Sequence, residues 1–351
     1  MSVNSNILKL QHEYKTRAVE SYKKAQLIFP LHQQEKMKQR ELLDQYRVYK
    51  MIWQILCIPN TDMMLKNIET NLKNTSIPLF RTELKKLMKR FAEELIPEVD
   101  YVGITELADP STNDSWVARL KPKMNIIITK NVEPIIPILI QNKHRIILHA
   151  TCTGLGKTYW EPDAPLASEQ LGAIRHLISL GFPVGQIVGR LDPVILGDKE
   201  QKVQDLVIDY FAQLGIKRLR YSFLDQYPAV KQRMHKHDIP FAMGFTYSLS
   251  EMQQYASRLV EKWGSSFHLE SCCENNMHQQ GCISQMDIDA LILNAPQNGA
   301  NTQNLLNLQL IGSKGSRKYC QCPLNKFELI RAVPGQCPMH CLYCYWNKNP
   351  F

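Results

Sequence analysis

The sequence lacks the segments that would place the protein in a membrane or direct it out of the cell. It contains no run of about 18 consecutive apolar residues, so we expect no transmembrane helix and no membrane partner. The first residues, MSVNSNILKLQHEYK, lack the apolar centre of a signal peptide. Low-complexity linkers and internal repeats are also missing. We therefore expect a cytoplasmic protein, and an apolar content of 44% with 21% charged residues is typical of a globular one.

A complete phosphate-binding loop is missing as well. The segment GLGKT (154–158) resembles the end of such a loop, but the pattern G-x-x-x-x-G-K-S/T requires glycine where this chain has Thr151. The residues YWEP (159–162) that follow cannot open a helix immediately. We therefore do not expect an ATPase.

Positive charge is concentrated near the N-terminus. The net charge of the 351 residues is +9, and residues 1–95 carry 17 Lys and Arg against 10 Asp and Glu, which is +7 of that total. Helical periodicity in Lys36–Leu56 and Thr82–Leu95 predicts a basic helical region over residues 1–97. Such a helical face either binds nucleic-acid phosphates or an acidic partner, or is simply a solvated surface.

From about residue 101 the pattern changes to short apolar runs separated by helical periodicity. Strands are predicted at Asn125–Thr129, Arg145–Thr151, Gly185–Arg190, Arg218–Phe223, Phe267–Glu270 and Phe327–Val333. Helices are predicted at Pro165–Leu180 and Lys199–Leu214. Because strands that alternate with helices form parallel sheets covered by helices, we predict an α/β domain over residues 98–351, with a cysteine-rich part at 272–344.

Polar residues with ligand-forming side chains follow successive predicted strands. They are Cys152, Arg190, Asp192, Asp225 and Cys272. A single such residue would carry little weight, since surface loops are polar in any case. The carboxyl ends of the strands in a parallel barrel converge on one mouth, where barrel active sites lie, so we expect these side chains to meet around one site.

A C-x₃-C-x₂-C triplet near the C-terminus, Cys337, Cys341 and Cys344, is the most informative motif. Three thiolates at this spacing can hold an iron–sulfur cluster and leave one iron without a protein ligand, free to bind a substrate or cofactor. A zinc knuckle completed by His340 is the alternative.

With Tyr343 directly before its third cysteine, the triplet resembles the signature of the radical S-adenosylmethionine (SAM) superfamily. About two-thirds of the chain, from residue 125, is similar to a poorly characterised radical-SAM-related family that carries this motif at its C-terminus. The matching segments are ITKN (128–131), EPDAP (161–165), RLDPVILGD (190–198), YSFLDQY (221–227), ESCCE (270–274), GCI (281–283), CQC (320–322) and CPMHCLYCY (337–345). EPDAP and RLDPVILGD also resemble spore photoproduct lyase, a DNA-repair enzyme.

The resemblance implies a lyase or oxidoreductase activity of radical SAM type. Cys337, Cys341 and Cys344 would hold a [4Fe–4S] cluster whose open iron binds SAM. One electron, from a donor of flavodoxin or ferredoxin type, would cleave SAM to a 5′-deoxyadenosyl radical that attacks an unknown substrate. In the manner of the lyase, that substrate could be nucleic acid held by the basic N-terminal helices.

The resemblance also implies a fold. In the usual radical SAM barrel the cysteine loop follows the first strand, whereas here it follows the last predicted strand, Phe327–Val333. This order implies a partial, circularly permuted (β/α) barrel of radical SAM type, preceded by an α-helical N-terminal region.

Some cofactor contacts follow from the resemblance. Tyr343 would pack beside the cluster near the adenine of SAM. Gly185, Ile187 and Gly189 match the G-x-I-x-G strand that lines adenine in the superfamily, although the same pattern is found where a strand packs closely against a helix.

Substrate and cofactor contacts are also expected at the strand ends. Arg190 and Asp192 would meet the carboxylate or ribose of SAM, or else form a structural ion pair. Asp225 and Glu161 are candidates for substrate or ribose contacts. Cys152 could donate a hydrogen atom to a substrate radical, although isolated cysteines are often small buried hydrophobic residues.

Five further cysteines form a second group: Cys272, Cys273, Cys282, Cys320 and Cys322. In a reducing cytoplasm such a group indicates metal ligation rather than disulfides. Four suffice for an auxiliary iron–sulfur cluster or a zinc ion, and the resemblance favours Cys272, Cys282, Cys320 and Cys322. The interval Asn294–Lys314, rich in Asn, Gln and Gly, is predicted to be a poorly packed loop that metal would hold at its ends. A non-catalytic binding protein with zinc in both cysteine groups is the remaining hypothesis.

Overall fold

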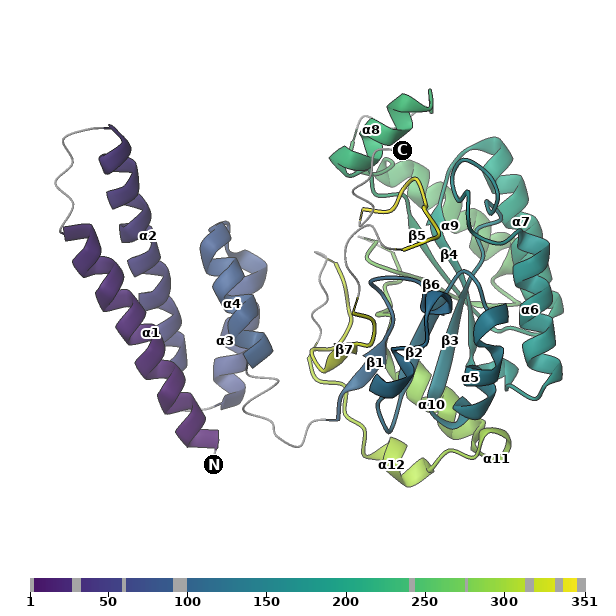
Figure 1. Ribbon diagram of the computed structural model, residues 1–351, viewed down its shortest axis with the longest axis horizontal. Helices are drawn as coiled ribbons and strands as arrows, with labels where there is room; N and C mark the ends of the chain where they lie inside the picture. The colour runs from purple at the N-terminus through teal and green to yellow at the C-terminus, as the bar shows by residue number, and fades with distance from the viewer. Residues whose placement is uncertain are drawn as a thin grey trace. The chain divides into compact units, whose positions relative to one another are not determined.

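The computed structural model of the chain consists of two compact units, Met1–Val99 and Asp100–Phe351 (Figure 1). It describes residues 3–26, 33–58, 61–90, 100–239, 244–274, 277–312, 319–331 and 337–345. In the part of the chain so described, no helix is both long and apolar enough to span a membrane.

The N-terminal unit is helical, as predicted. Its helices are α1 (Val3–Gln26), α2 (Gln33–Leu56), α3 (Thr61–Asn74) and α4 (Pro78–Arg90). The apolar stripe predicted for the last of them is confirmed, because Leu84 and Leu87 are fully buried. Glu83 is buried beside them and accepts a hydrogen bond of 2.7 Å from Lys86 Nζ, which keeps its carboxylate paired. Residues 91–95 of the predicted helix lie outside the described residues.

The second unit is built on a seven-stranded sheet of order β6-β5-β4-β3-β2-β1-β7, and every neighbouring pair is parallel. Its strands are β1 (Val102–Ile104), β2 (Asn125–Thr129), β3 (Ile146–Thr151), β4 (Ile187–Val194), β5 (Arg218–Phe223), β6 (His268–Ser271) and β7 (Lys326–Glu328). Its helices are α5 (Ile136–Gln141), α6 (Ala167–Ser179), α7 (Asp198–Gln213), α8 (Pro228–Lys236), α9 (Leu249–Trp263), α10 (Gln285–Leu293), α11 (Ala295–Asn298) and α12 (Thr302–Leu306). Short 3₁₀ turns lie at Pro110–Thr112, Val117–Arg119, Glu133–Ile135, Lys143–Arg145 and Val184–Gln186.

The predicted α/β class with a parallel sheet is therefore confirmed. The strands expected at Asn125–Thr129 and Arg218–Phe223 have the predicted bounds. One strand, β1, was not predicted, because its three residues are too few to produce a periodic pattern. The last strand in the sequence, β7, is shorter than predicted and pairs with β1, so that Gly103 lies opposite Phe327.

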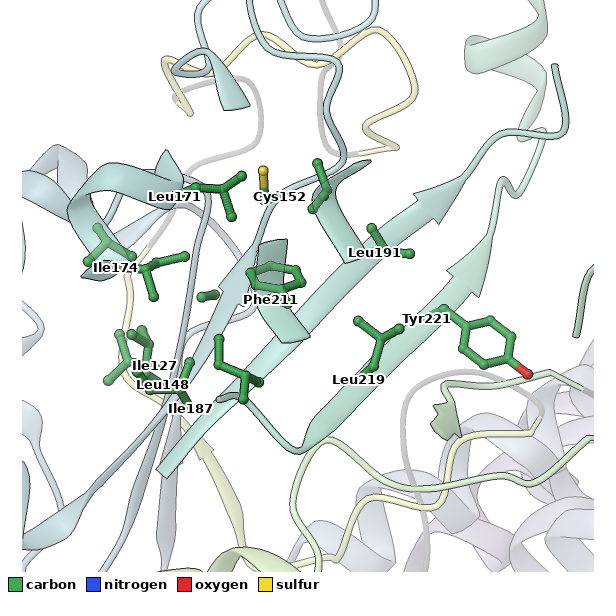
Figure 2. Close-up of a cluster of buried hydrophobic side chains, with 14 of the residues drawn as sticks. Ile127, Leu148, Cys152, Leu171, Ile174, Ile187, Leu191, Phe211, Leu219 and Tyr221 are labelled. Atoms are coloured by element: carbon green, nitrogen blue, oxygen red, sulfur yellow. The ribbon is translucent and has the colours of Figure 1, made fainter. Parts of the chain in front are cut away.

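Two hydrophobic clusters cover the two faces of the sheet. Because successive strand residues point to opposite faces, Leu148 and Ala150 of β3 face one cluster and Ile147 faces the other. The first cluster takes its helical side chains from α5, α6, α7 and α9, and Figure 2 shows part of it. The second takes them from α10 and α12 and includes the buried Cys272, Cys282 and Cys322.

The prediction of a poorly packed loop at Asn294–Lys314 is wrong for the described residues 294–312. This stretch forms α11 and α12, and Leu305 is buried in the second hydrophobic cluster. Its polar side chains serve as caps and internal donors: Asn301 Oδ1 accepts from Asn304 N at 3.1 Å, and Asn298 Nδ2 donates to Gln186 Oε1 at 2.6 Å. The amide-rich composition thus reflects helix ends and buried hydrogen bonds.

Candidate functional site

A cavity of about 260 Å³ lies at the carboxyl ends of the strands. Its wall includes residues that follow β1, β2 and β5, residues in the second half of β4, and residues of the segment 337–345. Both predicted cysteine groups reach it, through Cys337, Cys341 and Cys344 from one and through Cys272, Cys273, Cys282 and Cys320 from the other. The expectation that chemically active side chains meet at the strand ends thus applies to both groups of thiols.

The C-terminal triplet forms one packed cluster. Cys341 is buried with Met339 and Ala164, and Cys337 and Cys344 pack against them half-buried. Burial raises the pKa of the Cys337 and Cys341 thiols, so a metal that binds there must displace protons.

Side chains and backbone from distant parts of the chain hold the triplet loop. The buried Arg233 of α8 donates from Nε to Leu342 O and from Nη2 to Cys344 O, both at 2.7 Å. The backbone of Leu342 also donates to Trp160 O at 2.9 Å. His340, the alternative zinc ligand, bonds through Nδ1 to Asp163 Oδ2 at 2.7 Å. The loop is therefore positioned by hydrogen bonds that need no metal.

Tyr343 belongs to a buried polar network around Glu161. Glu161 Oε1 accepts from Lys130 Nζ at 2.9 Å and from Thr153 Oγ1 at 2.6 Å, and the Tyr343 hydroxyl donates to the same oxygen. Burial by itself would lower the pKa of Lys130, but attraction to Glu161 and Cys341 outweighs it, so this pKa is raised. Glu161, a candidate for substrate or ribose contacts, thus accepts three hydrogen bonds from protein donors at Oε1.

Arg190 and Asp192 form an ion pair on the cavity wall. Ser222 Oγ donates to Asp192 Oδ1 at 2.5 Å, which fixes the carboxylate. Burial by itself would lower the pKa of Arg190. Attraction to Asp192, Cys282 and Cys272 outweighs this effect, so the pKa is raised. Within the described residues, the buried Nε of Arg190 has no hydrogen-bond partner. The Arg190–Asp192 ion pair therefore links neighbouring side chains of the wall, and it also places a positive charge at the border of the cavity. Asp225 also lines the cavity.

A row of buried charges crosses the sheet behind this wall. Parallel pairing places Arg190 beside Arg220 and Arg220 beside Glu270. Arg218, on the same face, donates from Nε to Glu270 Oε1 at 2.8 Å. Burial and the neighbouring arginines hold the pKa of His149 well below its usual value, so its ring stays neutral. The alternation in RLRYSF could have identified Arg218 and Arg220 as residues that share one face.

Several predicted site residues do not line the cavity, Cys152 among them. Cys152 is a member of the first hydrophobic cluster (Figure 2), where burial raises the pKa of its thiol to about 12. It continues the side of β3 that carries Leu148 and Ala150, so the two-residue period of the strand directs it away from the cavity.

The same period explains the placement of Ile187 and Gly189, which were predicted with Gly185 to line the adenine of SAM. Ile187 is part of the first cluster, and a Cβ atom on Gly189 would lie 2.8 Å from the Phe211 ring of α7. Gly185 precedes β4, and its missing side chain makes room for Asn294 at the end of α10. The alternative reading, a strand packed closely against a helix, describes Gly189.

The second group is confirmed as a set of neighbouring thiols. Cys272 Sγ lies 3.7 Å from Cys282 Sγ and 3.9 Å from Cys273 Sγ, and Cys282 N donates to Cys322 Sγ at 3.1 Å. Hydrogen bonds from Cys273 and Cys322 lower the pKa of Cys320. Such a group can bind a metal ion or an iron–sulfur cluster.

A carboxylate that the sequence did not reveal joins this group. The ligand atoms of Glu106, Cys282 and Cys322 all lie within 4.8 Å of one another. Glu106 follows β1, the strand that was not predicted, and it shares no local motif with the cysteines. Only recognition of β1 would have placed it at the strand ends.

Comparison with known proteins adds one family. The model of a family described as "Domain of unknown function (DUF1848)" matches residues 73–346, which include α4, the whole sheet and both cysteine groups. No curated protein and no solved structure matches.

Proposed function

Starting from the chain's membership of the DUF1848 family, whose function is unknown, we propose that the protein is a radical SAM enzyme. The observation that carries the proposal is the packed cysteine triplet, which borders a cavity at the carboxyl ends of parallel strands. Enzymes with parallel α/β sheets hold their ligands at this end.

The donor set of the triplet fits a [4Fe–4S] cluster with one open iron. The three cysteines line the cavity, so a cluster on them would present its remaining corner to that space. Among the described residues, a trio of potential ligands within 4.8 Å is found at Glu106, Cys282 and Cys322 and not at the triplet. The wider spacing favours ligands on separate irons over three ligands on one zinc ion.

When reduced, a cluster with bound SAM supplies a 5′-deoxyadenosyl radical. The chain's own residues bind SAM and orient it. Arg190 offers a cation to the SAM carboxylate, and Asp192, fixed by Ser222, offers an acceptor to a ribose hydroxyl. Lys130 and Glu161 hold the Tyr343 ring beside the third cysteine. The cavity walls would surround the reacting atoms on several sides and so limit their contact with water and other hydrogen donors.

The strand order supports the finer proposal of a partial, circularly permuted (β/α) barrel. In sheet order the row begins with β7, the strand before the triplet, and continues through β1 to β6 in sequence order. A radical SAM barrel likewise begins with the strand that carries its cysteine loop. Cutting a barrel at another loop leaves the spatial arrangement of its site unchanged.

Anaerobic reconstitution tests the proposal. The full chain is loaded with iron and sulfide, its visible spectrum is recorded, and SAM is added with dithionite in place of a flavodoxin- or ferredoxin-type donor. We expect a brown protein that forms 5′-deoxyadenosine, and loss of this product in Cys341→Ala. Cys57→Ser, which alters an exposed thiol of the N-terminal unit, is the matched control. A colourless protein that leaves SAM intact would overturn the proposal.

A further inference from the structure

The second cysteine group and Glu106 form a site with different chemistry from the triplet. We propose that Glu106, Cys282 and Cys322 bind a single zinc ion whose fourth coordination position faces the cavity. This inference does not rest on the proposed radical SAM activity, because neither the ligands nor the geometry involves the triplet.

The spacing of the three ligand atoms fits one ion. A tetrahedral zinc ion with Zn–S bonds of about 2.3 Å and Zn–O bonds of about 2.0–2.2 Å holds its ligand atoms roughly 3.6–3.8 Å apart. The three atoms already lie within 4.8 Å of one another, so small side-chain rotations bring them to that distance. Thiolates on different irons of a cubane cluster point away from separate corners and lie farther apart.

The donor types also favour zinc over iron–sulfur. Iron–sulfur clusters are held by cysteine thiolates, with histidine as the known replacement in one class. A carboxylate beside two thiolates instead suits zinc, since zinc accepts sulfur, nitrogen and oxygen ligands. The presence of Glu106 among the ligands therefore favours a zinc ion over an iron–sulfur cluster at this site.

Neighbouring groups hold the ligands in place. Lys326 Nζ donates to Glu106 Oε2 at 2.6 Å, which leaves the other carboxylate oxygen for the metal. The backbone N–H of Cys282 donates to Cys322 Sγ at 3.1 Å, a bond that stabilises a thiolate. Such outer contacts orient metal ligands and tune their affinity.

The two cysteine loops can approach each other because residue 281 is glycine. A Cβ atom on Gly281 would lie 2.7 Å from Gln321 O and 2.9 Å from Cys322 N. Any side chain would therefore push the loop that carries Cys282 away from the loop that carries Cys322. The backbone itself is shaped to bring these two sulfur atoms together.

The fourth position faces the cavity. Glu106 and Cys282 both line it, whereas Cys322 is fully buried behind them. Three protein ligands and one position open to a cavity are the arrangement of catalytic zinc sites, in which water or a substrate donor atom completes the tetrahedron. The ligand expected there is a substrate oxygen or sulfur atom.

The test separates this site from the triplet. In the full chain with Cys337, Cys341 and Cys344 all changed to Ala, purified anaerobically, we expect one zinc ion per chain by mass spectrometry. Zinc X-ray absorption should show two sulfur ligands, with oxygen completing the shell. Four sulfur ligands, or iron with acid-labile sulfide in place of zinc, would overturn the proposal. Loss of SAM cleavage in this variant would bear on the proposed role of the triplet and not on the zinc site.

Ligand variants give the second arm. We expect Cys282→Ser, Cys322→Ser and Glu106→Gln each to weaken zinc binding by at least roughly 10- to 100-fold in competition with a chelator. Glu328→Gln is the matched control, because its carboxylate accepts from the Glu106 backbone yet lies outside the ligand trio. Cys273→Ser should also retain zinc. Unchanged affinity in Glu106→Gln would contradict the assignment, and circular dichroism identifies any variant that has not folded.

Discussion

The two cysteine groups border the same cavity but are assembled in opposite ways. The triplet spans eight residues, from Cys337 to Cys344, and its spacing alone identifies it as a candidate metal-binding motif. The second group draws Cys282 and Cys322 from segments 40 residues apart and adds Glu106 from beyond β1. A local motif can be recognised in a sequence, whereas a site assembled by the fold cannot be completed until the sheet is known.

The largest expected effect separates the two groups by function. Cys341→Ala should reduce 5′-deoxyadenosine to the background level and leave zinc at the second group unchanged. Cys282→Ser should remove the zinc and leave the brown colour of the triplet cluster. Product formation and metal content, measured on both variants, would show whether the groups are separate centres; a single variant that loses both metals would contradict this division.

The network around Tyr343 should account for the next largest effect. Lys130→Met leaves the carboxylate of Glu161, whose side chain is 4% exposed, without its cation. Breaking a buried pair in this way costs about 3–5 kcal/mol, and urea denaturation measures the loss.

A more exposed ion pair provides the comparison for that variant. Lys262 pairs with Asp205 at 3.2 Å, and its side chain is 46% exposed. Lys262→Met should therefore lower the free energy of unfolding by less than about 1 kcal/mol. Equal losses in the two variants would mean that the Lys130 pair is not a buried one.

Two glycine variants sharpen the comparison on the side of the second group. Gly281→Ala forces its Cβ against Gln321 O and should destabilise the protein by about 1–3 kcal/mol. It should also weaken zinc binding. Gly172→Ala, in α6 where no atom lies within 4 Å of the new Cβ, should stabilise by about 0.5–1 kcal/mol. Thermal unfolding measures the stability change in both variants. Stability changes of the same sign would contradict the close approach of the two cysteine loops.

The smallest effect is expected at Cys152, which belongs to neither group. Because burial raises the pKa of its thiol to about 12, the reactive thiolate is scarce in the folded protein near neutral pH. Iodoacetamide should therefore label the exposed Cys57 and leave Cys152 unmodified, as peptide mass spectrometry can show. Rapid labelling of Cys152 in the folded chain would place it back at the cavity.

Sequence periodicity predicted the parallel α/β sheet because each central strand is a buried apolar run between helices. The same reasoning found Arg190, Asp192 and Asp225 at the strand ends, where they line the cavity. It failed for β1, which is too short to give a pattern, and therefore for Glu106.

Side-chain direction was the other weakness of the sequence predictions. Cys152 follows β3 and Gly189 belongs to β4, but both lie on the face of the sheet that packs against α5, α6, α7 and α9. A residue's position along a strand determines how near it lies to the cavity at the strand ends. Whether it is an odd or an even residue of the strand determines which face of the sheet its side chain points to. Counting alternate residues from Leu148 would have assigned Cys152 to the core.

The pairing of β7 with β1 has a consequence for the order in which the molecule is assembled. These strands are more than 200 residues apart in sequence, and closing so long a loop is an unfavourable, slow step in folding. Cys322 precedes β7 closely and Cys337 follows it, so this one three-residue edge strand delivers thiols to both groups. On the proposed metal assignments, both cysteine groups reach their places only when β7 docks, so the metals should be inserted into a nearly finished sheet.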